Sequence, residues 1–193
     1  MERKLPEVVT PWEVAAIRLR NKRYNNVKAA HSADGGVNFC VSSATMILRA
    51  EILRDPKFQY AFTHDFWMGQ RQNTGDDNFI TRWVLFGHLF ENFHLEGNER
   101  RRRWKVGMQL TQEAQVGTSI MADSRFTGQI KRWSRSGLRH RLMCLLYEPG
   151  IRGMWQTCPF MTRKMVEGML NPILVWIRLY SWFKTAKVYP RMA

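Results

Sequence analysis

Residues 74–83 of this chain, Thr-Gly-Asp-Asp-Asn-Phe-Ile-Thr-Arg-Trp, are the stretch that decides the fold. A helix is predicted to begin here and to end at Gly87-His88, because apolar side chains recur at helical spacing along one face. Asp76 and Asp77 suit the start of that helix, where the backbone dipole favours negative charge. Two neighbouring carboxylates are also one way to build a general base. The apolar positions are Phe79, Ile80, Trp83, Val84 and Phe86.

The surrounding sequence predicts further helices and two short strands. Periodic apolar residues predict helices over 12–27, 44–53 and 124–147, the last with a break at Gly137. Runs typical of strands occupy 37–43 and 105–110, whereas 58–73 has no clean period and is expected to be a loop with short turns. Strands mixed with helices indicate an α/β domain followed by an α-helical tail.

Composition and charge narrow the class of protein. The chain has 193 residues, 45% of them hydrophobic and 24% charged, which excludes a disordered tail and a collagen-like repeat. Its net charge is +14, and residues 124–193 hold thirteen basic against two acidic side chains, so +11 of that charge lies in the last third. A basic region indicates an anionic partner, which could be nucleic acid, a membrane surface or a phosphate-bearing substrate.

Neither a metal site nor a complete membrane span is predicted. The three cysteines have no C-x-x-C spacing and the five histidines have no ligand spacing, so we expect no metal site and no disulfide framework. The apolar segment 165–183 is interrupted by charged and polar residues and is too short to span with confidence. Its Trp, Tyr and basic residues are typical of a segment at the membrane interface.

A second motif, Gln-x-x-Arg-Trp, lies in the predicted helix 124–147. Helical spacing places Gln129, Arg132 and Trp133 on one side, where they offer an amide, a guanidinium suited to diphosphate and an indole plane suited to a sugar. The alternative is an ordinary amphipathic helix, with a solvated Arg132 and a buried Trp133. Alone, the motif does not decide between these interpretations.

The two motifs, in this order and about fifty residues apart, resemble the processive inverting family-2 glycosyltransferases of the hyaluronan, chitin and cellulose synthase type. The sequence is most similar to the capsule-type polysaccharide synthases of fungi. Supporting stretches, all in the expected order, are HSADGGVNFCVSS at 31–43, LRAEIL at 48–53, FTHDFW at 62–67 and TGDDNFITRW at 74–83. The resemblance covers roughly residues 12–147.

The resemblance implies a role for each matching residue. Asp77, next to Asp76, would be the catalytic base that deprotonates the acceptor hydroxyl. Arg132 would lie near the diphosphate of the nucleotide sugar and Trp133 against the acceptor sugar, with Gln129 beside them. The acceptor-binding turn of the family would be formed by Phe39, Cys40, Ser42 and Ser43. An inverting displacement needs a base for the acceptor and stabilisation of the departing diphosphate, and these residues offer both.

One departure from the family limits this expectation. Family members hold the nucleotide and a Mg or Mn ion through an upstream Asp-x-Asp motif, and no Asp-x-Asp occurs in this sequence. The expected fold is therefore the C-terminal half of a GT-A-like transferase domain over 1–123, followed by basic amphipathic interface helices and a membrane-region stub over 124–193. On this interpretation the chain is truncated, holds no cofactor itself and is inactive alone.

The expected partners are a nucleotide sugar, a polysaccharide acceptor and an anionic membrane surface, with the catalytic part on the cytosolic face. The alternative class is a basic nucleic-acid-binding or membrane-surface module without catalysis. No nucleic-acid-binding motif supports it, and the basic residues of the tail alternate with apolar ones, as in membrane-surface helices. A polymerase Gly-Asp-Asp motif at Gly75–Asp77 is also disfavoured, because a helix rather than a hairpin strand is predicted after it.

Overall fold

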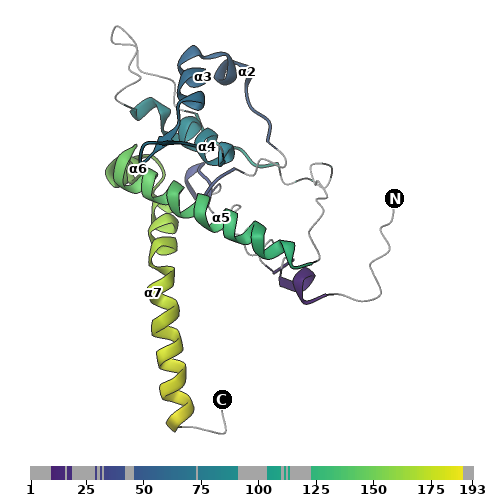
Figure 1. Cartoon of the computed structure of the whole chain (residues 1–193). Helices are drawn as coiled ribbons and strands as arrows, with labels where there is room; N and C mark the ends of the chain where they lie inside the picture. The colour runs from purple at the N-terminus through teal and green to yellow at the C-terminus, as the bar shows by residue number, and fades with distance from the viewer. Residues whose placement is uncertain are drawn as a thin grey trace.

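The computed structural model describes residues 10–15, 17–18, 29, 31, 33–41, 46–72, 74–90, 104–109, 111, 113 and 123–188. Within them the chain is mostly helical, with one two-stranded antiparallel sheet (Figure 1). The elements are α2 (Ala50–Arg54), α3 (Pro56–Thr63), β1 (Phe66–Trp67), β2 (Gln70–Arg71), α4 (Asp76–Phe86), the 3-10 turn η1 (Gly87–Leu89), α5 (Arg125–Leu142), the π-helical turn η4 (Met143–Tyr147), α6 (Gly150–Thr157) and α7 (Pro159–Val188).

Helix α4 lies at the centre of the molecule, and its predicted position is confirmed. It begins after Gly75, whose φ of 95° is in the left-handed region that favours glycine. It ends at Gly87, whose N–H bonds to the Trp83 carbonyl. All nine residues from Asn78 to Phe86 are buried, so α4 is enclosed on every side rather than on one face.

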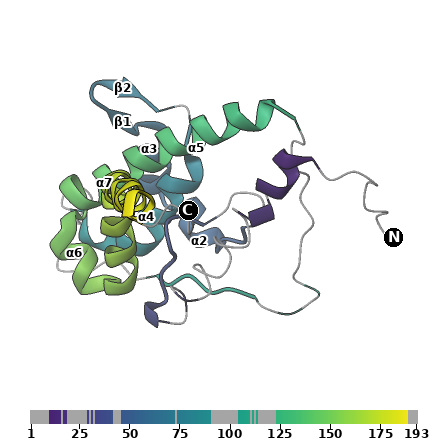
Figure 2. The same cartoon turned by 90° about the horizontal axis from the view of Figure 1, so that it is seen from below.

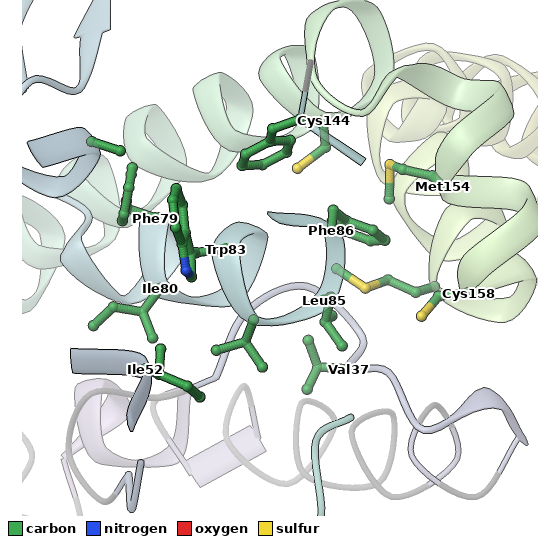
Figure 3. Packing of buried hydrophobic residues seen from close by; sticks show 14 of the residues in the cluster. Val37, Ile52, Phe79, Ile80, Trp83, Leu85, Phe86, Cys144, Met154 and Cys158 are labelled. Atoms are coloured by element: carbon green, nitrogen blue, oxygen red, sulfur yellow. The ribbon is translucent and has the colours of Figure 1, made fainter. Parts of the chain in front are cut away.

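The hydrophobic core surrounds α4. Side chains from the first half of the chain, such as Val37 and Ile52, pack below α4 in Figure 3. Side chains from the second half, Cys144, Met154 and Cys158, pack above it and to its right. Residues on both sides of the predicted boundary at 123/124 therefore share one core. Asp34 reinforces this connection, because its Oδ2 accepts from the N–H groups of Phe160 and Met161 in the first turn of α7.

The predicted strands are wrong in the part of the chain that the structure describes. Residues 37–41 and 104–109 form no strand, and the backbone bond from the Val106 N–H to the Gly35 carbonyl links 104–109 to the turn before residue 37. Side chains form the hydrogen bonds that a neighbouring strand would otherwise provide. The Val41 N–H donates to Thr81 Oγ1, and the Phe39 carbonyl accepts from His140 Nε2. The α/β expectation therefore gives way to a mostly helical fold.

Three other local predictions need correction. The segment 58–73, expected to be a loop, contains most of α3 and the hairpin β1–β2. The helix expected over 44–53 is shorter, since residues 46–49 are not helical and α2 begins at Ala50. Gly137 does not break α5, because it lies inside a continuous helix where the ring of Phe39 packs against it.

Helix α7 leaves the body of the molecule and ends far from the core (Figure 1). Its first turns are anchored by buried Met161, Thr162 and Met165, whereas residues 170–185 are all exposed. Seen along its axis, α7 lies beside α6, with the hairpin β1–β2 at one edge of the molecule (Figure 2). Among the described residues, no helix has an apolar stretch that is long enough to cross a membrane.

Candidate active site at the start of helix α4

Asp77 stands in the first turn of α4, partly buried, while its neighbour Asp76 is exposed. One carboxylate oxygen of Asp77 accepts from the Asn78 N–H at 2.8 Å, and the other lies 3.6 Å from the Cys40 Sγ. Thr81, one turn later, donates its hydroxyl to the Asp77 carbonyl and accepts from the Val41 N–H. The structure therefore brings Asp77 and Cys40, two predicted site residues from distant parts of the sequence, into contact.

Phe39, a third predicted site residue, packs on the C-terminal half of α5. Its ring meets His140 edge-on with centroids 5.0 Å apart, and the Arg141 guanidinium carbon lies 4.8 Å above it. His140 Nε2 is 3.0 Å from the Phe39 carbonyl oxygen, which can only accept, so this nitrogen carries the proton. Burial, together with nearby Arg82, holds the pKa of His140 well below its usual value, so the ring is neutral.

A basic side chain fixes the loop before α4. Arg139 donates to the side-chain oxygen of Gln72 and to the Thr74 carbonyl. A Cβ on Gly75 would lie 2.6 Å from Arg139 Nη2, so glycine is required there for space as well as for its backbone conformation. Desolvation lowers the pKa of Arg139, and the charges of Asp65 and Asp77 oppose that shift. Arg139 thus joins α5 to the turn that presents Asp77.

The Gln-x-x-Arg-Trp residues lie elsewhere on the same helix. Gln129 is partly buried, Arg132 is exposed, and Trp133 is 37% exposed with its ring against Phe126 at 6.4 Å. They belong to the N-terminal half of α5, which extends away from α4 (Figure 1). A hydrogen bond between α4 and α5 lies one turn further along α5, where Asn78 Nδ2 is 3.5 Å from the Ser136 carbonyl oxygen.

Ser42 and Ser43, the other predicted acceptor-turn residues, lie outside the described residues. The sequence pattern did not single out Arg139, His140 and Arg141, through which α5 contacts the residues around Asp77. Extending the helical stripe of Trp133 by one and two turns leads to Gly137 and then to His140 and Arg141. That extension was the signal that could have found them.

The site has the groups for proton abstraction beside positive charge. Asp77 can accept a proton, while Arg139 and Arg141, both partly buried on α5, supply cationic groups on the same side of α4. No three side chains of His, Cys, Asp or Glu in the described residues are grouped so that they could hold a metal ion. The side chains of the described residues therefore do not fit a Mg or Mn site.

The known proteins to which this chain is similar are named glycosyltransferases. The chain is 35% identical over 192 residues, all of its length, to the NDP-glycosyltransferase ltbB of Aspergillus luteorubrus, of which it covers 43%. A type 2 glycosyltransferase of Zymoseptoria tritici is 33% identical over 79% of this chain, which covers 28% of that protein. A type 2 glycosyltransferase of Pyricularia oryzae is 30% identical over 75% of this chain, which covers 26% of that protein.

No family model and no solved structure matches the chain. The matches to curated proteins show that the chain is similar to part of a glycosyltransferase. More narrowly, the names of its relatives support the type 2 family. The chain spans less than half the length of these curated relatives.

Proposed function

We propose that this chain is the acceptor-side part of an inverting family-2 glycosyltransferase of the polysaccharide synthase type, with Asp77 as its catalytic base. The observation that carries the proposal is the 35% identity to an NDP-glycosyltransferase along the whole chain. The geometry adds support, because Asp77 is held at the start of a buried helix and touches Cys40 from the proposed acceptor turn.

In the proposed reaction, a nucleotide sugar donates a hexosyl or N-acetylhexosaminyl group to a growing polysaccharide. Asp77 takes the proton from the acceptor hydroxyl as its oxygen forms a bond to the anomeric carbon, and the bond to the nucleoside diphosphate breaks. Cationic groups stabilise the departing diphosphate. Arg132 remains the proposed residue for that task, with Gln129 and Trp133 positioning the acceptor.

A direct test measures sugar transfer by the full-length enzyme that carries this chain. It would be incubated with labelled nucleotide sugars and an oligosaccharide acceptor, and the product analysed by mass and by the configuration of its new bond. We expect transfer from at least one donor with inversion at the anomeric carbon. Retention of configuration, or hydrolysis of every donor without transfer, would contradict the proposal.

We further propose that α7 holds the protein at the cytosolic face of an anionic membrane. Over residues 170–185 its large apolar side chains are exposed around the whole circumference, which is unfavourable in water and typical of helices that enter lipid or another protein. Arg178, Lys184 and Lys187 lie among the Trp and Tyr residues, a composition suited to anionic headgroups.

A further inference from the structure

One cavity of the described residues lies away from Asp77. It has a volume of about 790 Å³ and is bounded by α3, the hairpin β1–β2, α4 and η4. Phe79, Arg82 and Trp83 line it from α4. With 3.6 residues per helical turn, Phe79 and Trp83 leave α4 on the side opposite to Asp77 and Thr81, which face Cys40 and Val41, whereas Arg82 lies between the two sides. The cavity is therefore a place distinct from the candidate active site.

Aromatic rings form its walls. Trp67 of β1 meets Tyr147 of η4 edge-on with centroids 5.5 Å apart, and Tyr147 is 66% exposed. On α3, the ring of Tyr60 stacks on His64 at 4.1 Å. Such rings offer flat apolar faces together with polar edges, the combination that the alternating C–H and hydroxyl surfaces of a sugar ring require.

A buried ion pair is part of the same cavity wall. Asp65 Oδ1 lies 3.1 Å from Arg82 Nη2, and the two side chains retain only 11% and 6% of their exposure. Glu148 also lines the cavity. The guanidinium of Arg82 is already paired with Asp65, so the cavity offers this cation less readily to an anion such as a nucleotide diphosphate.

A wholly apolar ligand is disfavoured as well. It would cover the remaining exposed surface of Asp65 without replacing the hydrogen bonds that water makes there. A neutral ligand with many hydroxyl groups meets both requirements, because it stacks on the rings and can donate to the Asp65 carboxylate. The volume is within the range of roughly 300–1,000 Å³ typical of small-molecule sites.

We propose that this cavity is a second carbohydrate-binding site, which holds a neutral saccharide away from the reaction centre at Asp77. The choice of saccharide as the ligand rests on the proposed function, whereas the separation from Asp77 rests on the geometry of α4. In the enzyme, such a site would retain the acceptor chain at a distance from the sugar that receives the new unit.

Binding to the full chain tests the proposal without any need for catalysis. The purified protein would be titrated with neutral di- to hexasaccharides of glucose and of N-acetylglucosamine, using saturation-transfer NMR and tryptophan fluorescence, with uridine diphosphate as the anionic comparison. We expect millimolar or tighter binding of at least one saccharide. Tyr147→Ala, at an exposed position that should tolerate the change, is expected to weaken it at least tenfold, and Trp67→Phe to weaken it less.

Two control variants separate this site from others. Trp176→Ala removes an exposed tryptophan on α7, and Trp155→Ala removes one on α6; both should bind the saccharide as the unchanged protein does. Loss in either control equal to that in Tyr147→Ala, or no saccharide binding at all, would overturn the proposal. Because sugar transfer is measured separately, failure here leaves the proposed function open to its own test.

Discussion

Single residues around the start of α4 have strict steric requirements. Gly75 combines a φ of 95° with a side-chain position that is already occupied by Arg139 and Asn78. Gly128, on α5, has open space where a Cβ would be placed. The two glycines therefore form a matched pair, in which one is required by the structure and the other is not.

We predict that Gly75→Ala lowers the free energy of unfolding by about 1–3 kcal/mol, because alanine is strained at this φ and its Cβ would clash with Arg139. Gly128→Ala should instead raise it by about 0.5–1 kcal/mol, the usual gain from glycine to alanine inside a helix. Urea denaturation followed by circular dichroism measures both changes. Equal effects of the two substitutions would show that the turn at Gly75 is not as described.

His140 makes the stability depend on pH. Burial holds the pKa of His140 well below 6.5 in the folded protein, so the unfolded chain binds a proton that the folded chain does not. Stability should therefore be full above about pH 6.5 and fall below it, by at most about 1.4 kcal/mol per pH unit for this group.

His140→Gln tests this pH dependence, because glutamine can still donate to the Phe39 carbonyl but does not titrate. We expect the variant to lose part of the fall in unfolding free energy between pH 6.5 and pH 5, measured by urea titrations at each pH. Thr127→Ala, at an exposed position of α5, is the control and should keep the wild-type slope. An unchanged slope in His140→Gln would contradict a neutral buried ring.

The sequence predicts helices, which form from a local pattern, better than strands, which need a partner elsewhere in the chain. Helices α4 and α5 were predictable, since their periodicity and terminal glycine or polar residues lie within one short stretch. The segments 37–41 and 104–109 have strand-like composition, but a strand exists only through a partner, and here Thr81 and His140 take up the backbone groups instead.

The same distinction applies to the candidate site. Asp77 could be predicted from the turn and helix around it, whereas its contact with Cys40 depends on a chain separation of 37 residues. The Gln-x-x-Arg-Trp motif predicted the helix that reaches this region, but the residues of α5 in contact with it lie one to two turns later. Packing of α5 across α4 determines that offset, and no local pattern encodes it.

Helix α7 carries a prediction of its own. Removal of residues 170–193 should abolish flotation with anionic liposomes, because the exposed apolar part of the helix is lost. The thermal midpoint should change little, since the buried residues of α7, such as Met161 and Met165, remain. Removal of everything after 123 would not be a clean test, because η4, α6 and α7 all contribute to the core.

A matched pair of substitutions controls for this truncation. Trp176→Glu on α7 should weaken liposome binding several-fold, whereas Trp155→Glu, an exposed tryptophan on α6, should leave it nearly unchanged. Undiminished flotation of the truncated chain would contradict the membrane proposal. Salt-sensitive binding to duplex DNA without liposome binding would favour the alternative class of basic module.

For the molecule as a whole, one core joins a candidate catalytic helix to a basic helix and an exposed apolar one. We propose that Asp77, rather than its neighbour Asp76, is the base of a glycosyl transfer reaction. The two carboxylates differ in environment, since only Asp77 is partly buried and in contact with Cys40.

The most direct test compares Asp77→Asn with Asp76→Asn in the full-length enzyme, by the rate of labelled sugar transfer and by the affinity for the nucleotide sugar. We predict that Asp77→Asn lowers kcat by about 10²–10⁴-fold, as expected for loss of a general base, with donor affinity unchanged. Asp76→Asn should have a much smaller effect. Sugar transfer by Asp77→Asn at the rate of the unchanged enzyme would contradict the account.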